Sequence, residues 1–232
     1  MPQAYCECIY GLGGSVLDPA GGMATLMAKI KALGVITPNV PWDQANIQAV
    51  ADAVNKHPAD AMVFLIGDSC GANKAPWVAA AVYPRKISYM ACIQASVYCQ
   101  NGCPDIPNNV QQAFVIYSDY VHTGGLGCYI PIRAAGNTVT RYRQAYVAAP
   151  HPDDNDVANV QNPILADIKN LLDTHPATVA AAAVSANQPG ASKSGSATTG
   201  TRSSRKFVRT KRIELLPASL AELEKDVDRI AF

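Results

Sequence analysis

Apolar and polar positions along the chain follow two alternating periods, which predicts strands separated by helices. Strand-like runs cover residues 4–10, 61–67, 86–95, 109–119 and 137–149, and a short extended segment covers 35–41. The run at 61–67 (AMVFLIG) is apolar throughout, which is typical of a strand buried on both faces. Helical spacing appears at 22–33, 43–57, about 72–82 and about 156–172, where Pro163 predicts a bend or a restart.

Strands that alternate with helices favour a mostly parallel sheet that is covered on both faces. We therefore expect residues 1–175 to form an α/β domain, a three-layer αβα sandwich with about six strands. Nearly half of the residues in the chain are apolar, which is enough to build such a core.

The composition of the chain changes after His175. Residues 176–201 consist mainly of Ala, Ser, Gly and Thr, which predicts a flexible linker. Residues 202–232 begin with a basic segment and end in a predicted helix, which Ser219 and Glu222 cap and which carries an apolar stripe. We expect these residues to form an extended C-terminal arm that interacts with a protein partner or with neighbouring subunits.

The net charge of +1 conceals an asymmetry between the body and the tail. Residues 1–175 carry ten basic and thirteen acidic side chains, whereas residues 176–232 carry nine and five. The body therefore has no basic surface of the kind that nucleic acids require. Six basic residues within 202–212 could contact phosphates, but a solvated basic arm is the preferred interpretation.

The cellular location is only partly constrained by the sequence. The first residues lack the basic and apolar regions of a signal peptide, and no apolar run is long enough to span a membrane. We expect a cytoplasmic protein, or one that is incorporated into a phage virion or another large particle.

The chain contains seven cysteines, an odd number. Cys6 and Cys8 share one face of a predicted strand, and Cys99 and Cys103 bracket a turn where a local disulfide could form. Neither paired Cys-x2-Cys elements nor suitable histidines accompany them, so we expect no metal site. The cluster formed by Asp153, Asp154 and Asp156 is interpreted as acidic residues at the start of a helix, and no cofactor is expected.

The segment Gly67-Asp68-Ser69-Cys70-Gly71 is the motif with the clearest chemical meaning. A G-x-S-x-G pattern alone is weak, but here a buried strand leads into it and an Ala-rich helix leaves it. The small residues allow a sharp turn that lifts the Ser69 hydroxyl clear of the backbone. The N-terminus of the following helix favours negative charge at that point.

With these flanks, residues 4–175 resemble the α/β-hydrolase superfamily, in particular its small cutinase-like and esterase-like members. The motif resembles the nucleophile elbow of that family, and the segment 9–15 (IYGLGGS) stands where the family has a glycine-rich turn. Tyr10 occupies a position where the family often has histidine. The resemblance implies an oxyanion hole formed by the backbone N–H groups of Cys70 and Leu12.

The order of residues in the family implies a catalytic triad of Ser69, Asp119 and His151. Asp119 follows the predicted strand at 109–119, and His151 follows the last strand. Asp105 and Asp153 are the alternative acids, and His122 is the alternative base. Two further histidines, His57 and His175, precede prolines at helix ends and are expected to be solvated.

The resemblance favours a serine hydrolase of the esterase or lipase type, which acts on a small acyl ester through an acyl-enzyme intermediate. The segment 122–137 would form one wall of the substrate pocket, made partly apolar by Tyr129, Ile130 and Ile132. The alternative is a structural or adaptor component of a large assembly such as a phage virion. Such a component would use the hydrolase-like body as a scaffold and residues 202–232 as a tether.

Overall fold

The predicted strands and helices form in the predicted order. The computed structural model describes residues 3–11, 21–100, 103–119, 129–148 and 157–186. The strands are β1 (Ala4–Ile9), β2 (Met62–Asp68), β3 (Tyr89–Ile93), β4 (Gln112–Tyr117) and β5 (Arg141–Tyr146). The helices are α1 (Gly22–Ala32), α2 (Ile47–Lys56), α3 (Cys70–Ala81) and α4 (Ala158–Ala186), with short 3-10 turns η2 (Gln44–Asn46) and η3 (Val97–Cys99).

The five strands form one parallel sheet in the order β1-β2-β3-β4-β5. The extended segment predicted at 35–41 lies beside the outer edge of β1, where Ile36 pairs with Tyr5 and Trp42 pairs with Ile9 as isolated parallel bridges. This segment contains Pro38 and Pro41, which have no N–H to donate, so a continuous ladder cannot form. The expectation of about six strands is met by five strands and this interrupted one.

The side of the sheet on which the next strand is added changes between β1 and β2. After β1 the chain passes through α1 to the outer edge at Ile36, and α2 then returns it to the other side of β1. From β2 onward, each strand is added on the side away from β1. In open parallel sheets, sites lie at the carboxyl ends of the strands where such a change occurs.

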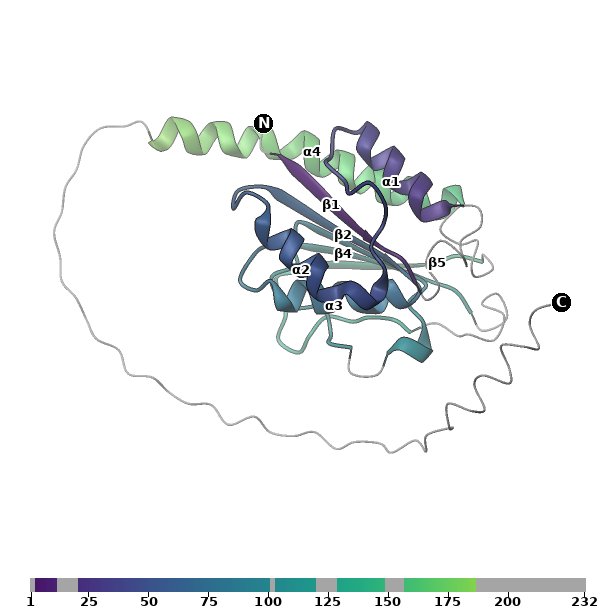
Figure 1. Ribbon diagram of the computed structural model, residues 1–232. Helices are drawn as coiled ribbons and strands as arrows, with labels where there is room; N and C mark the ends of the chain where they lie inside the picture. The colour runs from purple at the N-terminus through teal and green to yellow at the C-terminus, as the bar shows by residue number, and fades with distance from the viewer. Residues whose placement is uncertain (1–2, 12–20, 101–102, 120–128, 149–156, 187–232) are drawn as a thin grey trace, which may run out of the picture. The chain divides into compact units, whose positions relative to one another are not determined.

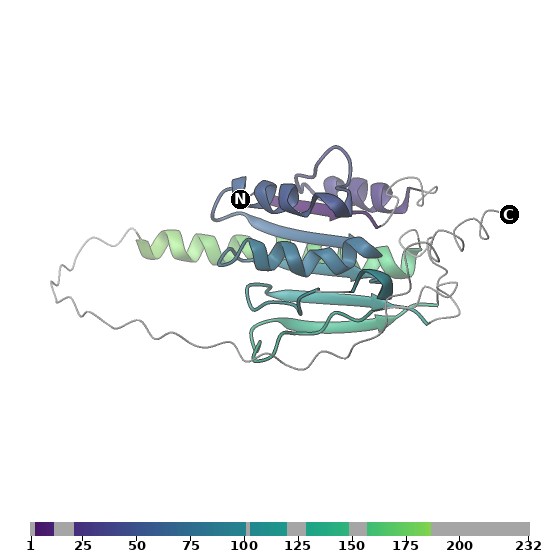
Figure 2. The ribbon, with the colours of Figure 1, turned by 60° about the horizontal axis from the view of Figure 1, so that its bottom comes forward.

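Two layers of helices cover the sheet, as Figures 1 and 2 show, and the predicted three-layer sandwich is therefore confirmed. Helices α1 and α4 pack on one face, and their apolar side chains meet Cys6, Cys8, Phe64 and Ile66. Helices α2 and α3 pack on the other face, against Ile9, Val63 and Leu65. Successive residues of β1 and β2 point to opposite faces, which explains why their burial is nearly complete.

Helix α4 extends further than its sequence pattern predicts. It runs without interruption from Ala158 to Ala186, so Pro163 does not restart it. It also continues past His175 into the segment for which we expected a flexible linker. Alanine has the highest helix propensity of all residues, and the alanine-rich run at 177–186 continues the helix once α4 has formed. The remainder of the expected linker and the whole of the arm at 202–232 lie outside the described residues.

His57 is not the solvated side chain that its position before a proline suggested. Its Nε2 atom lies 2.8 Å from Oε1 of Glu7, a buried carboxylate on β1, and its ring stacks on Tyr5 with the ring centres 3.9 Å apart. The indole N–H of Trp42 donates to the other carboxylate oxygen at 2.5 Å. The end of α2 carries His57 over β1, so that Glu7 links α2, β1 and the edge segment.

Candidate active site

Ser69 lies at a sharp turn between β2 and α3. Its backbone has φ 52° and ψ −123°, in a region that residues with a side chain rarely adopt. The turn is held by its N–H, which donates to the Ile93 carbonyl at 2.9 Å, and by its carbonyl, which accepts from the Ala72 N–H at 3.0 Å. Such backbone strain costs of order 1–3 kcal/mol and is concentrated at functional sites.

The two glycines of the motif make this turn possible by removing side-chain volume. A Cβ atom on Gly67 would overlap the Gly71 carbonyl, and a Cβ atom on Gly71 would overlap the Ile9 carbonyl. The first turn of α3 therefore packs directly on the backbones of β1 and β2. Ser69 precedes the first residue of α3, so it lies at the positive end of the helix dipole.

Gly11, which follows β1 and begins the glycine-rich segment, contacts the Ser69 side chain. A Cβ atom on Gly11 would lie 2.6 Å from the Ser69 Cβ and 3.0 Å from its Oγ. Ser69 and the start of the glycine-rich segment, far apart in the sequence, are therefore in contact where the side of strand addition changes. Leu12, the expected second oxyanion donor, is the next residue and lies outside the described residues.

Asp119 lies just beyond β4, at the same carboxyl edge of the sheet. The hydroxyl of Tyr146, at the end of the neighbouring strand β5, donates to its Oδ2 atom at 2.7 Å. This hydrogen bond, together with the charge of the carboxylate, raises the pKa of Tyr146. The sequence gives no signal for this role of Tyr146, because the pairing of β4 with β5 that sets Tyr146 opposite Tyr117, close to Asp119, is known only from the structure.

Ser69 and Asp119 follow strands β2 and β4, with β3 between them. Neighbouring strands are about 4.8 Å apart, so the two strand ends are separated by roughly 10 Å. This separation is wide enough for an imidazole ring that contacts a hydroxyl on one side and a carboxylate on the other. The expected base, His151, and the alternative residues His122 and Asp153 lie outside the described residues.

Asp105, the other alternative acid, is located differently from Asp119. It precedes Ile106, which forms an isolated bridge with Arg133, and its charge is one of the lesser causes that raise the pKa of Tyr129. Tyr129 itself donates its N–H to the Ala95 carbonyl at 2.5 Å, just beyond β3. Tyr129 and Ile130 pack against the core beneath them, whereas Ile132 is exposed. Of the segment expected to form a pocket wall, residues 122–128 lie outside the described residues.

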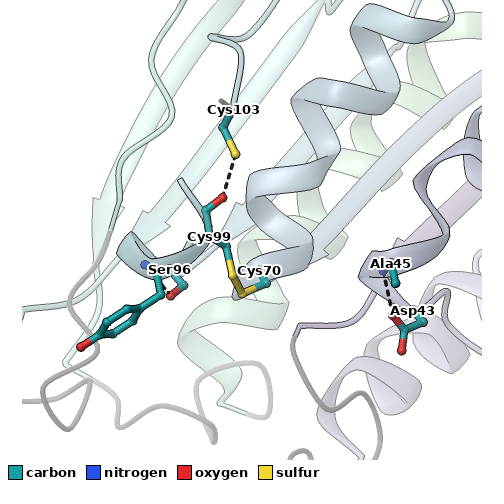
Figure 3. The surroundings of a disulfide bond; sticks show 7 residues. Asp43, Ala45, Cys70, Ser96, Cys99 and Cys103 are labelled. Atoms are coloured by element: carbon teal, nitrogen blue, oxygen red, sulfur yellow. Dashed lines mark hydrogen bonds between the residues drawn. A yellow bond between two sulfur atoms is a disulfide. The ribbon is translucent and has the colours of Figure 1, made fainter. Parts of the chain in front are cut away.

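The structure pairs Cys99 with Cys70, so the local disulfide that the sequence allowed between Cys99 and Cys103 does not form. The Cα atoms of Cys70 and Cys99 are 5.3 Å apart, and the bond joins the first residue of α3 to η3 (Figure 3). Cys103 remains a thiol, and its S–H donates to the Cys99 carbonyl at 3.0 Å. The position after the proposed nucleophile is therefore covalently tied to the loop that follows β3.

Two further properties of the described residues bear on possible chemistry. They contain no group of three or more His, Cys, Asp or Glu side chains placed to hold a metal ion. Within the same residues, no helix is both long enough and apolar enough to cross a membrane. Asp153, Asp154 and Asp156 are not among them.

Comparison with known proteins gives matches only at the level of structure, since no family model and no curated protein matches the sequence. The chain is similar to the thioesterase RedJ of the prodiginine pathway of Streptomyces coelicolor, with 16% identity and a TM-score of 0.46. That match covers 73% of this chain and 85% of the thioesterase.

Two other solved structures give similar values. Est1E from Butyrivibrio proteoclasticus has 11% identity and a TM-score of 0.48, over 76% of this chain and 89% of Est1E. A sugar hydrolase from Lactococcus lactis has 12% identity and a TM-score of 0.37, over 77% of this chain and 92% of that protein. Because these similarities are distant, we base the function of this chain on the geometry around Ser69.

Proposed function

We propose that this protein is a serine hydrolase that cleaves carboxylic esters through an acyl-enzyme intermediate. The observation that carries the proposal is the contact between Gly11 and the side chain of Ser69, which itself occupies a strained turn at the N-terminus of a helix. A serine that only closed a turn would not need this backbone conformation, nor a glycine from a distant segment against its side chain.

In the proposed reaction, the Ser69 Oγ attacks the carbonyl carbon of the ester while His151 accepts its proton. The negative charge that develops on the carbonyl oxygen is stabilised by the N–H groups of Cys70 and Leu12. The alcohol then leaves with the proton from His151, and a water molecule cleaves the acyl-enzyme by the same steps in reverse. Asp119 holds the imidazole in the required tautomer.

Two features of the described residues support these roles. The Cys70 N–H belongs to the first turn of α3, where helix N–H groups have no partner within the helix. Asp119 accepts a hydrogen bond from Tyr146 on one carboxylate oxygen, which restricts the rotation of the carboxylate.

The proposal is tested by labelling with a fluorophosphonate, which reacts with activated serines. The wild-type protein should be labelled at Ser69, as shown by peptide mapping, and Ser69→Ala should not be labelled at all. Ser88→Ala, which alters a buried serine at the amino end of β3, is the matched control and should be labelled like the wild type. A folded wild-type protein that is not labelled would refute the proposal.

A second candidate function is that of an assembly component tethered by residues 202–232. The basic composition of residues 202–212 and the helix pattern that follows favour this function. It is compatible with catalysis, because an active enzyme can be carried on a particle.

A further inference from the structure

Three cysteines gather at the carboxyl edge of the sheet, beside the proposed nucleophile. Cys70 and Cys99 form the disulfide, and Cys103 donates its thiol hydrogen to the backbone of Cys99. In Figure 3, Cys99 lies between the other two, and the Cys103 sulfur points toward the Cys99 carbonyl oxygen. A reduced thiol thus lies beside the backbone of a residue that forms one half of a disulfide.

Cys103 has the exposure that a reactive thiol requires. It is partly buried, and this burial raises the pKa of its thiol, while the charge of Lys74 and the polar groups of Trp77 and Asn73 partly offset the rise. The net effect is a raised pKa, so the thiolate, which is the form that attacks a disulfide, becomes more abundant at Cys103 as the pH rises.

The other thiol close to Cys103 is not suited to this reaction. Cys92 is fully buried on β3, and burial, with a smaller contribution from Cys103, raises the pKa of its thiol to about 12. Cys92 therefore stays protonated over the physiological range. Of these two thiols, only Cys103 can act as the nucleophile toward Cys99.

We propose that Cys103 exchanges with the Cys70–Cys99 disulfide and so releases Cys70 as a free thiol beside Ser69. The Cys103 thiol first loses its proton to water or hydroxide. Its sulfur then bonds to the Cys99 sulfur as the Cys70–Cys99 bond breaks, and the departing Cys70 thiolate takes up a proton. The reaction exchanges one disulfide and one thiol for another such pair, so it needs neither an oxidant nor a reductant.

The exchange regulates the site of the proposed function, and this consequence rests on that function. In the resting state, the disulfide fixes the first residue of α3 to η3, and with it the N–H that would stabilise the oxyanion. Once Cys70 is released, this N–H is held only by the helix. We expect Ser69 to react with a fluorophosphonate more slowly in the exchanged form.

The exchange itself is tested by mapping disulfides in the full-length protein, without measuring catalysis. The wild type is incubated without added thiol at pH 7, 8 and 9, quenched with acid, alkylated and digested without reduction. Peptides linked through Cys99 and Cys103 should form, with Cys70 alkylated, and their initial rate of formation should rise about tenfold per pH unit below the pKa of Cys103. Absence of this cross-link at every pH would overturn the proposal.

Two variants isolate the residue that is responsible. Cys103→Ser should keep Cys70–Cys99 as its only cross-link in this region at all three pH values. Cys92→Ala, which removes the neighbouring thiol, should exchange like the wild type. Exchange that persists in Cys103→Ser, or that is lost in Cys92→Ala alone, would overturn the assignment of Cys103.

Labelling of Ser69 then tests the regulatory consequence. The labelling rate of the wild type should fall as the exchanged form accumulates, whereas Cys103→Ser should keep its rate after the same incubation. Equal rates before and after exchange would refute regulation by Cys103. If neither protein is labelled before incubation, the proposed hydrolase function fails, while the disulfide map still decides whether the exchange occurs.

Discussion

At the scale of single residues, the backbone of β1 leaves no room for a side chain at Gly71. A methyl group at this position would overlap the Ile9 carbonyl, which cannot move without disturbing the sheet. We expect Gly71→Ala to lower the free energy of unfolding by about 3 kcal/mol or more. Gly136→Ala is the control, because it has open space around it and costs only about 1 kcal/mol for its φ of 79°.

Urea denaturation of both variants measures these losses. Equal destabilisation of the two would mean that the close approach between α3 and β1 does not constrain Gly71. The same close approach explains why the motif needs glycine on both sides of the turn, which the pattern alone could not establish.

The Cys92 thiol predicts how stability changes in alkaline solution. Its pKa is raised from about 9 to about 12 by burial, so the unfolded chain loses this proton first as the pH rises. Between these two values, Cys92 lowers the free energy of unfolding by about 1.4 kcal/mol per pH unit. Urea denaturation between pH 9 and 10.5 measures how steeply the free energy of unfolding falls with pH. This fall should be smaller in Cys92→Ala than in the wild type by about 1.4 kcal/mol per pH unit, which corresponds to one proton. An unchanged slope would contradict the protonated state of this thiol.

The chemistry of individual residues was only partly predictable. Ser69 was identified because a turn motif stood between a buried strand and a helix. The Cys70–Cys99 bond was not, because cysteine spacing does not reveal which distant cysteines meet in the fold. The contact between Glu7 and His57 could not be predicted for the same reason, since β1 and the end of α2 become neighbours only in three dimensions.

At the scale of elements, α4 covers one face of the sheet through a narrow apolar stripe. Val160, Ile164 and Ile168 are completely buried in the cluster that α4 shares with α1. We expect Ile164→Ala to cost 2–5 kcal/mol, the usual range for a cavity in a well-packed core. Asn162→Ala, on the exposed side of the same helix, should change stability by less than about 0.5 kcal/mol.

Thermal denaturation compares the two variants, and a small effect of Ile164→Ala would mean that the first half of α4 is not part of the core. The existence of this helix was predictable from its spacing, whereas its end was not. Local patterns predict an amphipathic helix only where apolar residues recur at helical spacing, and α4 continues beyond Leu172 into an alanine-rich sequence.

The strands were the most predictable elements, because a fully buried parallel strand needs an unbroken apolar run such as the one in β2. The edge segment was the least predictable. Its two prolines remove hydrogen-bond donors, so that only Ile36 and Trp42 pair with β1.

At the scale of the whole molecule, the tail beyond Gln188 can be separated from the body by deletion. The compact unit that holds the sheet and its helices ends at that residue. We expect a chain that stops at Gln188 to unfold at the same temperature as the full chain and to retain labelling of Ser69. Loss of labelling in a folded, truncated protein would show that the tail contributes to catalysis.

The same deletion tests the alternative function. An assembly component should lose incorporation into its particle when residues 189–232 are removed, even though its body remains folded. A hydrolase that needs no tether should keep its labelling of Ser69 after the deletion. Measuring particle association and labelling on the same two proteins therefore separates the two functions.

The strand order also determines which pairing must form before the site is assembled during folding. Ala4 pairs with Met62, whereas Phe64 pairs with Tyr89 and Met90 with Ala113, so the β1–β2 junction closes the longest loop in the sheet. Gly11 and Ser69 meet at that junction. The other strands can pair through shorter connections. Ser69 meets Gly11 only after β1 has joined the sheet.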